Sequence, residues 1–193
     1  MTLPDIALLG RARSGKDTIA NYLVDRHGYV RVAFADALKE MALAANPSIP
    51  DMLWTDGDPY RLSDAVEADG WEGAKDEYPE VRRFLQGLGV AVRAQQPDFW
   101  LLKGEQKAYE AFSAGKPAVF TDVRFLNEVR ALEARGFMTV SVTRPCRITE
   151  GLDAVDTHVS ETELAKYKTD RDICNAGTIA DLEEDVRRVV LGM

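Results

Sequence analysis

Nine residues near the N-terminus have the types and spacing to bind phosphate. The segment Gly10-Arg11-Ala12-Arg13-Ser14-Gly15-Lys16-Asp17-Thr18 separates two glycines by four residues and follows the second with lysine, which is the Walker A spacing. Backbone N–H groups in such a loop surround phosphate oxygens, and the lysine ammonium reaches further along the phosphate chain. The residues expected to bind nucleotide here are Gly10, Ala12, Arg13, Ser14, Gly15, Lys16, Asp17 and Thr18.

The magnesium ligand is the point at which this loop departs from the usual motif. Asp17 stands where serine or threonine normally offers a hydroxyl, and Thr18 follows one place later. Either Asp17 holds the metal, directly or through water, or Thr18 takes that role. Asp122 closes an apolar stretch in a Walker-B-like position and is a second candidate metal ligand. Its alternative role is the N-cap of the helix that follows.

The sequence on either side of the loop predicts the elements that must position it. The apolar run 6–9 indicates a buried parallel strand. After the loop, Ile19, Ala20, Leu23 and Val24 recur at helical spacing, which places Lys16 in the first turn of a helix. A strand, a glycine-bounded loop and a helix N-terminus together favour anion binding.

Strands and helices alternate along the remaining sequence, which predicts one α/β domain over residues 1–193 with a five-stranded parallel sheet and helices on both faces. Asp36 is expected to cap the helix over 37–45, and the segment 46–79 is expected to be a long loop with at most a short helix over 62–68. The further strands are expected at 29–35, 118–121, 137–143 and 172–175. The further helices are expected at 80–94, 99–114, 123–135 and 161–167 and after Gly177.

Polar residues follow each predicted strand, where ligands of parallel sheets bind. They are Asp36, Lys39, Asp122, Arg124, Arg144, Arg147, Asn175 and Gly177. Cations that neutralise phosphate oxygens, together with carboxylates that hold magnesium, suit phosphoryl transfer. The catalytic residues predicted are Lys16, Arg13, Arg124 and Arg144. We expect His158 to be structural or to support another site residue rather than to be catalytic. A phosphate acceptor is already an anion and needs no general base.

The predicted helix 80–94 carries Arg82, Gln86, Gly89 and Arg93 along one line. This line is either an anion-binding surface or an ordinary solvated face, and spacing alone does not separate the two.

Composition narrows the function classes. The net charge is −8, which argues against nonspecific nucleic-acid binding. We find no targeting segment or membrane-length apolar run, and the two cysteines and two histidines show no metal-ligand spacing. These features predict a cytoplasmic enzyme with reduced thiols.

Three groups of motifs resemble the bacteriophage deoxynucleoside monophosphate kinases, within the P-loop nucleoside monophosphate kinases. They are the loop 13–18 with its aspartate, the segment 82–89 with Trp100 downstream, and 121–124 with Asn127-Glu128. Arg144-Pro145, Asp156-Thr157-His158 and Asn175 extend the resemblance over most of the chain. Val90 stands where we would expect threonine, and the segment 46–80 matches nothing in the family.

The resemblance implies ATP- and Mg²⁺-dependent transfer of a γ-phosphate to a deoxynucleoside monophosphate, giving the diphosphate. It implies an acceptor region over 36–115, a lid over ATP at 144–160, and an adenine-bordering turn at 175–178 that includes Asn175 and Gly177. A phage enzyme would act in the host cytoplasm, and a homodimer is an open alternative. The residues implied to bind the acceptor are Phe34, Asp36, Lys39, Arg82, Gln86, Trp100 and Arg124.

Two other functions compete with this interpretation. One is a different small-molecule kinase resembling dephospho-coenzyme A kinase, which a panel of acceptors would distinguish. The other is a binding protein regulated by ATP, in which no small acceptor would accelerate ADP release. A catalytically inactive phosphate-loop fold is a third alternative.

Overall fold

The computed structural model describes residues 3–49, 60–145, 164 and 167–193. The chain divides into two compact units, one formed by Met1–Ala33 with Gly104–Met193 and the other by Phe34–Lys103. The expectation of a single domain over residues 1–193 stays a prediction.

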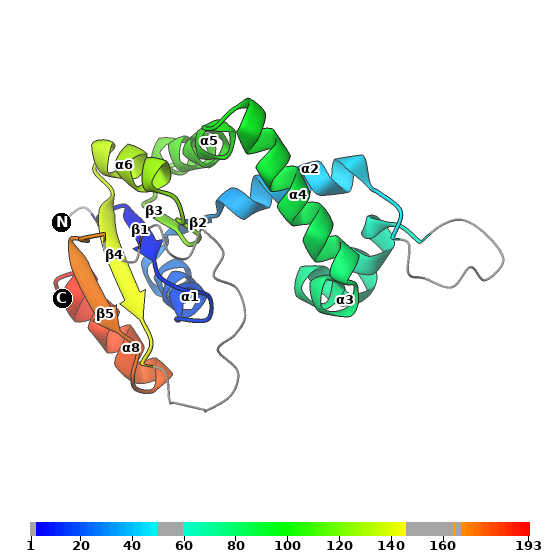
Figure 1. The fold of residues 1–193 in the computed structure, drawn as a ribbon. Helices are drawn as coiled ribbons and strands as arrows, with labels where there is room; N and C mark the ends of the chain where they lie inside the picture. Colours follow the sequence, from blue (N-terminus) through cyan, green and yellow to red (C-terminus); the bar gives the residue numbers. More distant parts are fainter. Residues whose placement is uncertain (1–2, 50–59, 146–163, 165–166) are drawn as a thin grey trace. The chain divides into compact units, whose positions relative to one another are not determined.

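The first unit is built on a parallel sheet (Figure 1). Its five strands lie in the order β2-β3-β1-β4-β5 and every described pairing is parallel, which confirms the predicted α/β fold. All four residues of the central strand are buried, because neighbouring strands and both covering layers exclude water from it. The strands are β1 (Ile6–Leu9), β2 (Val30–Val32), β3 (Ala118–Phe120), β4 (Met138–Thr143) and β5 (Arg171–Cys174).

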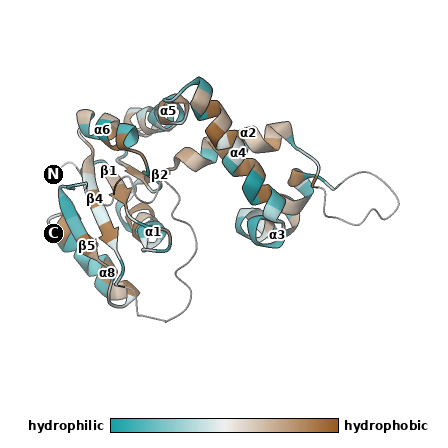
Figure 2. Cartoon of the chain, in the orientation of Figure 1, coloured by the Kyte–Doolittle hydropathy of each residue, from teal (hydrophilic) through white to brown (hydrophobic). Residues whose placement is uncertain are grey.

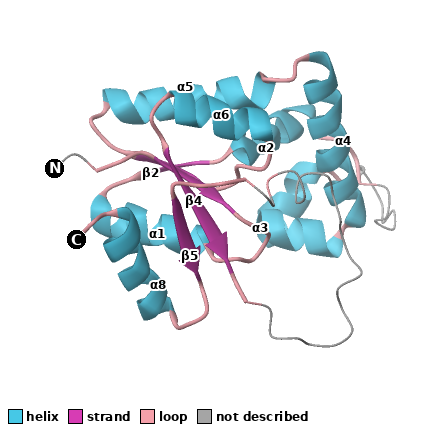
Figure 3. Cartoon of the chain, turned by 60° about the vertical axis from the view of Figure 1, so that its left-hand side comes forward, coloured by secondary structure: helices cyan, strands magenta, loops and turns pink. Residues whose placement is uncertain are grey.

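Helices cover both faces of this sheet (Figure 3). On one face, α1 (Lys16–His27), α8 (Ile179–Asp185) and η1 (Val186–Val190) share a core with Ile6, Leu8 and Val140. On the other face lie α6 (Leu126–Ala134) and the part of α5 (Phe99–Ser113) from Gly104 onward. β1 thus directs alternate side chains to opposite layers.

The second unit is helical and has its own small core. It contains α2 (Phe34–Ala45), α3 (Leu62–Glu77) and α4 (Pro79–Gln95). Apolar and polar residues recur along α4 (Figure 2), and its apolar positions meet those of the other two helices. The buried members of this core are Ala42, Ile49, Leu62, Ala65, Ala74, Val81 and Leu85.

The expected loop over 46–79 was wrong in its second half, because α3 is a long helix from Leu62 to Glu77. Gly70 does interrupt the helical backbone, with φ 67° and ψ 177°. The chain resumes helix after this break, since Leu62 and Ala65 before it and Ala74 after it are buried in one core. Tertiary packing therefore overrides the glycine signals that indicated a loop.

Two helix starts also differ from the sequence expectation. β2 ends at Val32 and α2 begins at Phe34, so Asp36 lies in the first helical turn and is not the N-cap. The helix expected from 123 begins at Leu126, and Glu128 Oε2 accepts hydrogen bonds from the backbone N–H groups of Arg124 and Phe125 at 2.9 and 3.0 Å. The N-cap is therefore Phe125, which removes the capping alternative for Asp122.

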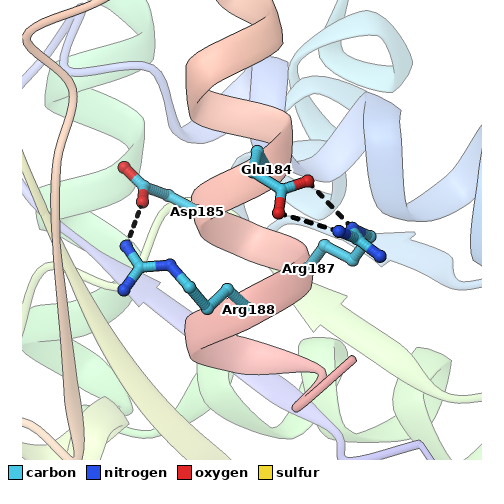
Figure 4. A network of polar contacts seen from close by, with 4 residues as sticks. All are labelled: Glu184, Asp185, Arg187 and Arg188. Carbon is cyan, nitrogen blue, oxygen red and sulfur yellow. Dashed lines mark hydrogen bonds and ion pairs between the residues drawn. The ribbon is translucent and has the colours of Figure 1, made fainter.

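The last helix ends in a π-helical turn, in which Leu191 N donates to Val186 O at 3.1 Å. Its outer surface carries the pairs Glu184–Arg187 and Asp185–Arg188 (Figure 4). These exposed i,i+3 pairs add little to stability. Within the described residues, no helix is long and apolar enough to cross a membrane.

Candidate active site

The loop between β1 and α1 has a backbone that only glycine accommodates at both ends. Gly10 has φ 142° and Gly15 has φ 110°, conformations that side chains disfavour. A Cβ atom at Gly10 would lie 2.3 Å from the carbonyl oxygen of Val142, and one at Gly15 would lie 2.4 Å from Asn175 Nδ2. Glycine is therefore favoured by φ at both positions, and at Gly10 it is also favoured by the fixed backbone that lies beside it.

Lys16 begins α1, as the sequence predicts. Its ammonium group donates hydrogen bonds to the carbonyl oxygens of Gly10 and Arg11, both at 2.7 Å. The side chain thus turns back across the loop, and the positive charge lies beside the N-terminus of α1. Both favour an anion at this place.

Ser14 supplies a polar atom suited to a bound anion. Its side chain is 3% exposed, and its hydroxyl has no hydrogen-bond partner among the described residues. A buried hydroxyl without a partner is uncommon. A phosphate oxygen in the loop would provide one, so this residue fits the expected nucleotide.

Asn175 ties the loop to the far edge of the sheet. Its side-chain amide donates to the carbonyl oxygen of Ser14 at 2.9 Å, and its backbone N–H donates to Thr143 O at 2.7 Å. The family resemblance implied an adenine-bordering role for Asn175. It gave no sign of this contact, because the two residues are 161 positions apart.

A cavity of about 1230 Å³ opens beside the loop in the first unit. Its lining includes three of the four predicted catalytic residues, all of them exposed: Arg13, Arg124 and Arg144. A concentration of guanidinium groups in a chain of net charge −8 makes a local positive site for an anion. The cavity is lined by Leu9, Gly10, Arg11, Ala12, Arg13, Ser14, Val123, Arg124, Ser141, Val142, Thr143, Arg144, Pro145, Leu164, Tyr167, Thr169, Asn175, Ala176 and Gly177.

The predicted magnesium ligands lie at the same edge of the sheet. Asp17 is exposed in the first turn of α1, Thr18 beside it is partly buried, and Asp122 follows β3, the strand that pairs with β1. No group of three or more His, Cys, Asp or Glu residues suited to a metal occurs in the described part of the chain. Magnesium is commonly held by one or two carboxylates completed by phosphate oxygens and water, and these residues fit that mode.

The residues implied to bind the acceptor belong mainly to the second unit. Lys39 Nζ lies 5.5 Å from the centre of the Trp71 ring, and Arg82 forms an ion pair of 2.9 Å with Asp76. Trp71 was missed, because its segment was expected to be loop and matched nothing in the family. Phe34 is buried and Asp36 is partly buried in the first turn of α2.

Trp100 and the line of residues on α4 have mixed surroundings. Trp100 is 3% exposed, and its indole N–H donates to Gly89 O at 3.2 Å. Arg82 and Gln86 are exposed, whereas Gly89 lies against Leu38. The line predicted from spacing is therefore open at its N-terminal half and covered at Gly89. Arg147, His158 and residues 146–160 of the expected lid lie outside the described residues.

A sequence model of deoxynucleotide monophosphate kinases matches residues 63–186. The chain belongs to this family. The resemblance stated from the motifs is thereby confirmed.

Relatives of this deoxynucleotide monophosphate kinase family member occur in viruses. A protein of Ictalurid herpesvirus 1 named ORF77 is 30% identical over 182 residues, with 94% of this chain and 68% of that protein covered. ORF76 of the same virus is 26% identical, and the chain spans 64% of its length. A protein of Acanthamoeba polyphaga mimivirus, provisionally named a deoxynucleotide monophosphate kinase, is 29% identical, with 85% of this chain and 83% of that protein covered.

Solved structures that align with this chain have lower sequence identity to it than the viral relatives do. Dephospho-CoA kinase from Campylobacter jejuni is 16% identical with a TM-score of 0.46, covering 94% of this chain and 92% of its own. An unliganded sugar kinase from Janibacter sp. is 16% identical with a TM-score of 0.48, covering 96% and 92%.

Proposed function

We propose that this chain is an ATP-dependent deoxynucleoside monophosphate kinase, which transfers the γ-phosphate of ATP to a deoxynucleoside monophosphate and releases ADP and the diphosphate. The observation that carries the proposal is the glycine-bounded loop at the carboxyl edge of a parallel sheet, opening on an arginine-lined cavity. Membership of the family supports the choice of acceptor.

The donor side is formed by the loop and the cavity. Backbone N–H groups from Gly10 to Thr18 bind the phosphates. The Lys16 ammonium group, which donates to the carbonyl oxygens of Gly10 and Arg11 in the free loop, exchanges these partners for phosphate oxygens. Gly177, in the turn that follows Asn175, borders the nucleoside. Because the loop is already formed, little reorganisation accompanies binding, which favours the transition state.

The acceptor side requires positive charge and no base. An oxygen of the acceptor monophosphate forms the new bond to the γ-phosphorus while the bond to the bridging oxygen of ADP breaks, so the acceptor needs no deprotonation. Arg124 holds the acceptor phosphate, and Arg13 and Arg144 stabilise the charge that moves onto ADP. The nucleoside of the acceptor is contacted or supported by the remaining acceptor residues, which are Phe34, Asp36, Lys39, Arg82, Gln86 and Trp100.

Magnesium, held through Asp17 or Thr18 and Asp122, would neutralise phosphate charge and orient the phosphate chain. These magnesium ligands are predicted residues, as are the residues assigned to the acceptor.

The test is a coupled assay of ADP release with each common deoxy- and ribonucleoside monophosphate and with dephospho-coenzyme A. We expect turnover with at least one deoxynucleoside monophosphate. Lys16→Met should lower kcat by about 100-fold or more, while Lys116→Met, a change at an exposed turn before β3, should leave it unchanged. Turnover of dephospho-coenzyme A alone, or ATP binding that no acceptor converts to ADP release, would exclude the proposal.

A further inference from the structure

We propose that Asn175 is a positioning residue that fixes the peptide group between Ser14 and Gly15, so that the Gly15 N–H faces the phosphate chain. This inference rests on the proposed role of the loop in binding phosphate. It assigns Asn175 a role on the loop backbone in place of the adenine contact indicated by the family resemblance.

Asn175 is held by two hydrogen bonds, one from its side chain and one from its backbone. The side-chain amide of Asn175 donates to Ser14 O at 2.9 Å, while its backbone N–H donates to Thr143 O at 2.7 Å. Thr143 is the last residue of β4. The amide that holds the loop therefore belongs to a residue that is itself hydrogen-bonded to the end of β4.

The planarity of the peptide bond converts this contact into an orientation for the next N–H group. The described chain has no cis peptide bond, and in a trans peptide the C=O and the following N–H point in opposite directions. With the Ser14 carbonyl held toward Asn175, the Gly15 N–H must point away from Asn175. A peptide rotated by half a turn would instead direct the carbonyl oxygen at the phosphates, which is electrostatically unfavourable.

Gly15 is the position at which such a rotation would be easiest. It has φ 110° and no side chain to restrict its backbone. The lack of a side chain also allows Asn175 to approach, because a Cβ there would lie 2.4 Å from Nδ2. The absence of a side chain at Gly15 thus leaves the peptide group able to rotate, and it also leaves room for Asn175, whose hydrogen bond prevents that rotation.

Binding of tripolyphosphate, which carries no base, separates this role from an adenine contact. We would measure dissociation constants for tripolyphosphate and for ATP by calorimetry on the full chain, with and without Mg²⁺. Asn175→Leu keeps the size of the side chain and removes the donor, and Asn175→Ala is a second variant in case the leucine does not fit. Cys174→Ala, at the exposed preceding residue, is the matched control, and thermal unfolding checks that each variant is folded.

We expect Asn175→Leu to weaken tripolyphosphate and ATP binding by the same factor, about tenfold, as one lost orienting hydrogen bond predicts. The NMR resonance of the Gly15 amide proton should shift downfield when tripolyphosphate is added to the wild type and to Cys174→Ala. It should shift much less in Asn175→Leu. Cys174→Ala should match the wild type throughout.

Three results would contradict the proposal. Loss of ATP affinity with unchanged tripolyphosphate affinity would return Asn175 to the adenine, and unchanged affinity for both would remove it from binding. A wild type that does not bind tripolyphosphate would exclude the phosphate site and this role together. If tripolyphosphate binds but no monophosphate is turned over, the proposed enzyme function fails, while the variants still decide the role of Asn175.

Discussion

At the scale of the residue, the chemistry of this protein lies in backbone groups that a few side chains arrange. Gly10 and Gly15 have backbone conformations that residues with side chains rarely adopt, and both lie in close contact with a neighbouring segment. Lys16 and Ser14 then bring a cation and a buried hydroxyl to the same loop. Because the loop is local in sequence, its role could be predicted from residue types and spacing alone.

Arg124 provides a test at this scale. It is exposed and lines the cavity, so we expect Arg124→Ala to raise KM for the acceptor by about ten- to a hundredfold, the value of a lost charge-assisted contact. The affinity for ATP should change far less. Steady-state kinetics and calorimetry measure the two quantities, and Arg130→Ala, at an exposed position on α6, is the control. An equal loss in both would assign Arg124 to the donor side.

At the scale of the element, hydrogen bonds between Asp170, just before β5, and Thr139 of β4 hold the edge strand of the sheet. Asp170 Oδ2 accepts hydrogen bonds from the backbone N–H and the hydroxyl of Thr139, both at 2.9 Å, and Asp170 N donates to Thr139 Oγ1 at 3.0 Å. These contacts set the register of β5 on β4. Through β5 they place Asn175, so an exposed aspartate affects where the loop is held.

The same aspartate predicts a dependence of stability on pH. The hydrogen bonds from Thr139 hold the pKa of Asp170 below its ordinary value of 3.8. A lowered pKa in the folded state stabilises the protein above the unfolded pKa, and this contribution is lost as the pH falls through the folded value.

We therefore expect Asp170→Asn to lower the free energy of unfolding by up to about 1 kcal/mol at pH 7, since the carboxylate is exposed. The difference from wild type should shrink as the pH falls below 3.8. Urea unfolding at a series of pH values measures it, with Asp25→Asn on an exposed face of α1 as the control. A difference that persists unchanged in acid would contradict the charge-based explanation.

At the scale of the whole molecule, two separate cores support the residues that we propose for the donor and most of those that we propose for the acceptor. The core of the first unit includes Leu23 of α1 and underlies the phosphate loop. The core of the second unit includes Leu62 of α3 and supports α2 and α4, which carry Lys39, Arg82 and Gln86. Both leucines are at most 1% exposed, so they form a matched pair for comparing the units.

Replacing either leucine with alanine should lower the free energy of unfolding by about 2–5 kcal/mol. We expect Leu23→Ala also to weaken tripolyphosphate binding several-fold, because α1 carries Lys16 and small displacements are costly. Leu62→Ala should leave tripolyphosphate binding intact and raise KM for the monophosphate. Calorimetry and kinetics at a temperature where both variants are folded provide the comparison, and identical effects of the two changes would show that the cores do not serve separate ligands.

The amino-acid sequence by itself determined the α/β class, the parallel strands and the phosphate loop. These features depend on short-range patterns such as the buried run Ile6–Leu9 and the spacing of Gly10 and Gly15. It also placed Lys16, Arg124 and Arg144 at the carboxyl ends of their strands, because that position follows from parallel topology.

Only the tertiary structure decided the features that depend on contacts between distant segments. The contact of Asn175 with Ser14 joins residues 161 positions apart, and the helix through Gly70 exists because residues on both sides of the break share a core. The cap that Glu128 gives α6 joins residues only three or four positions apart, but the side-chain geometry that makes it is not visible in their spacing. Local patterns fix which elements form, whereas their ends and their long-range contacts are settled by packing, whose energy no short segment contains.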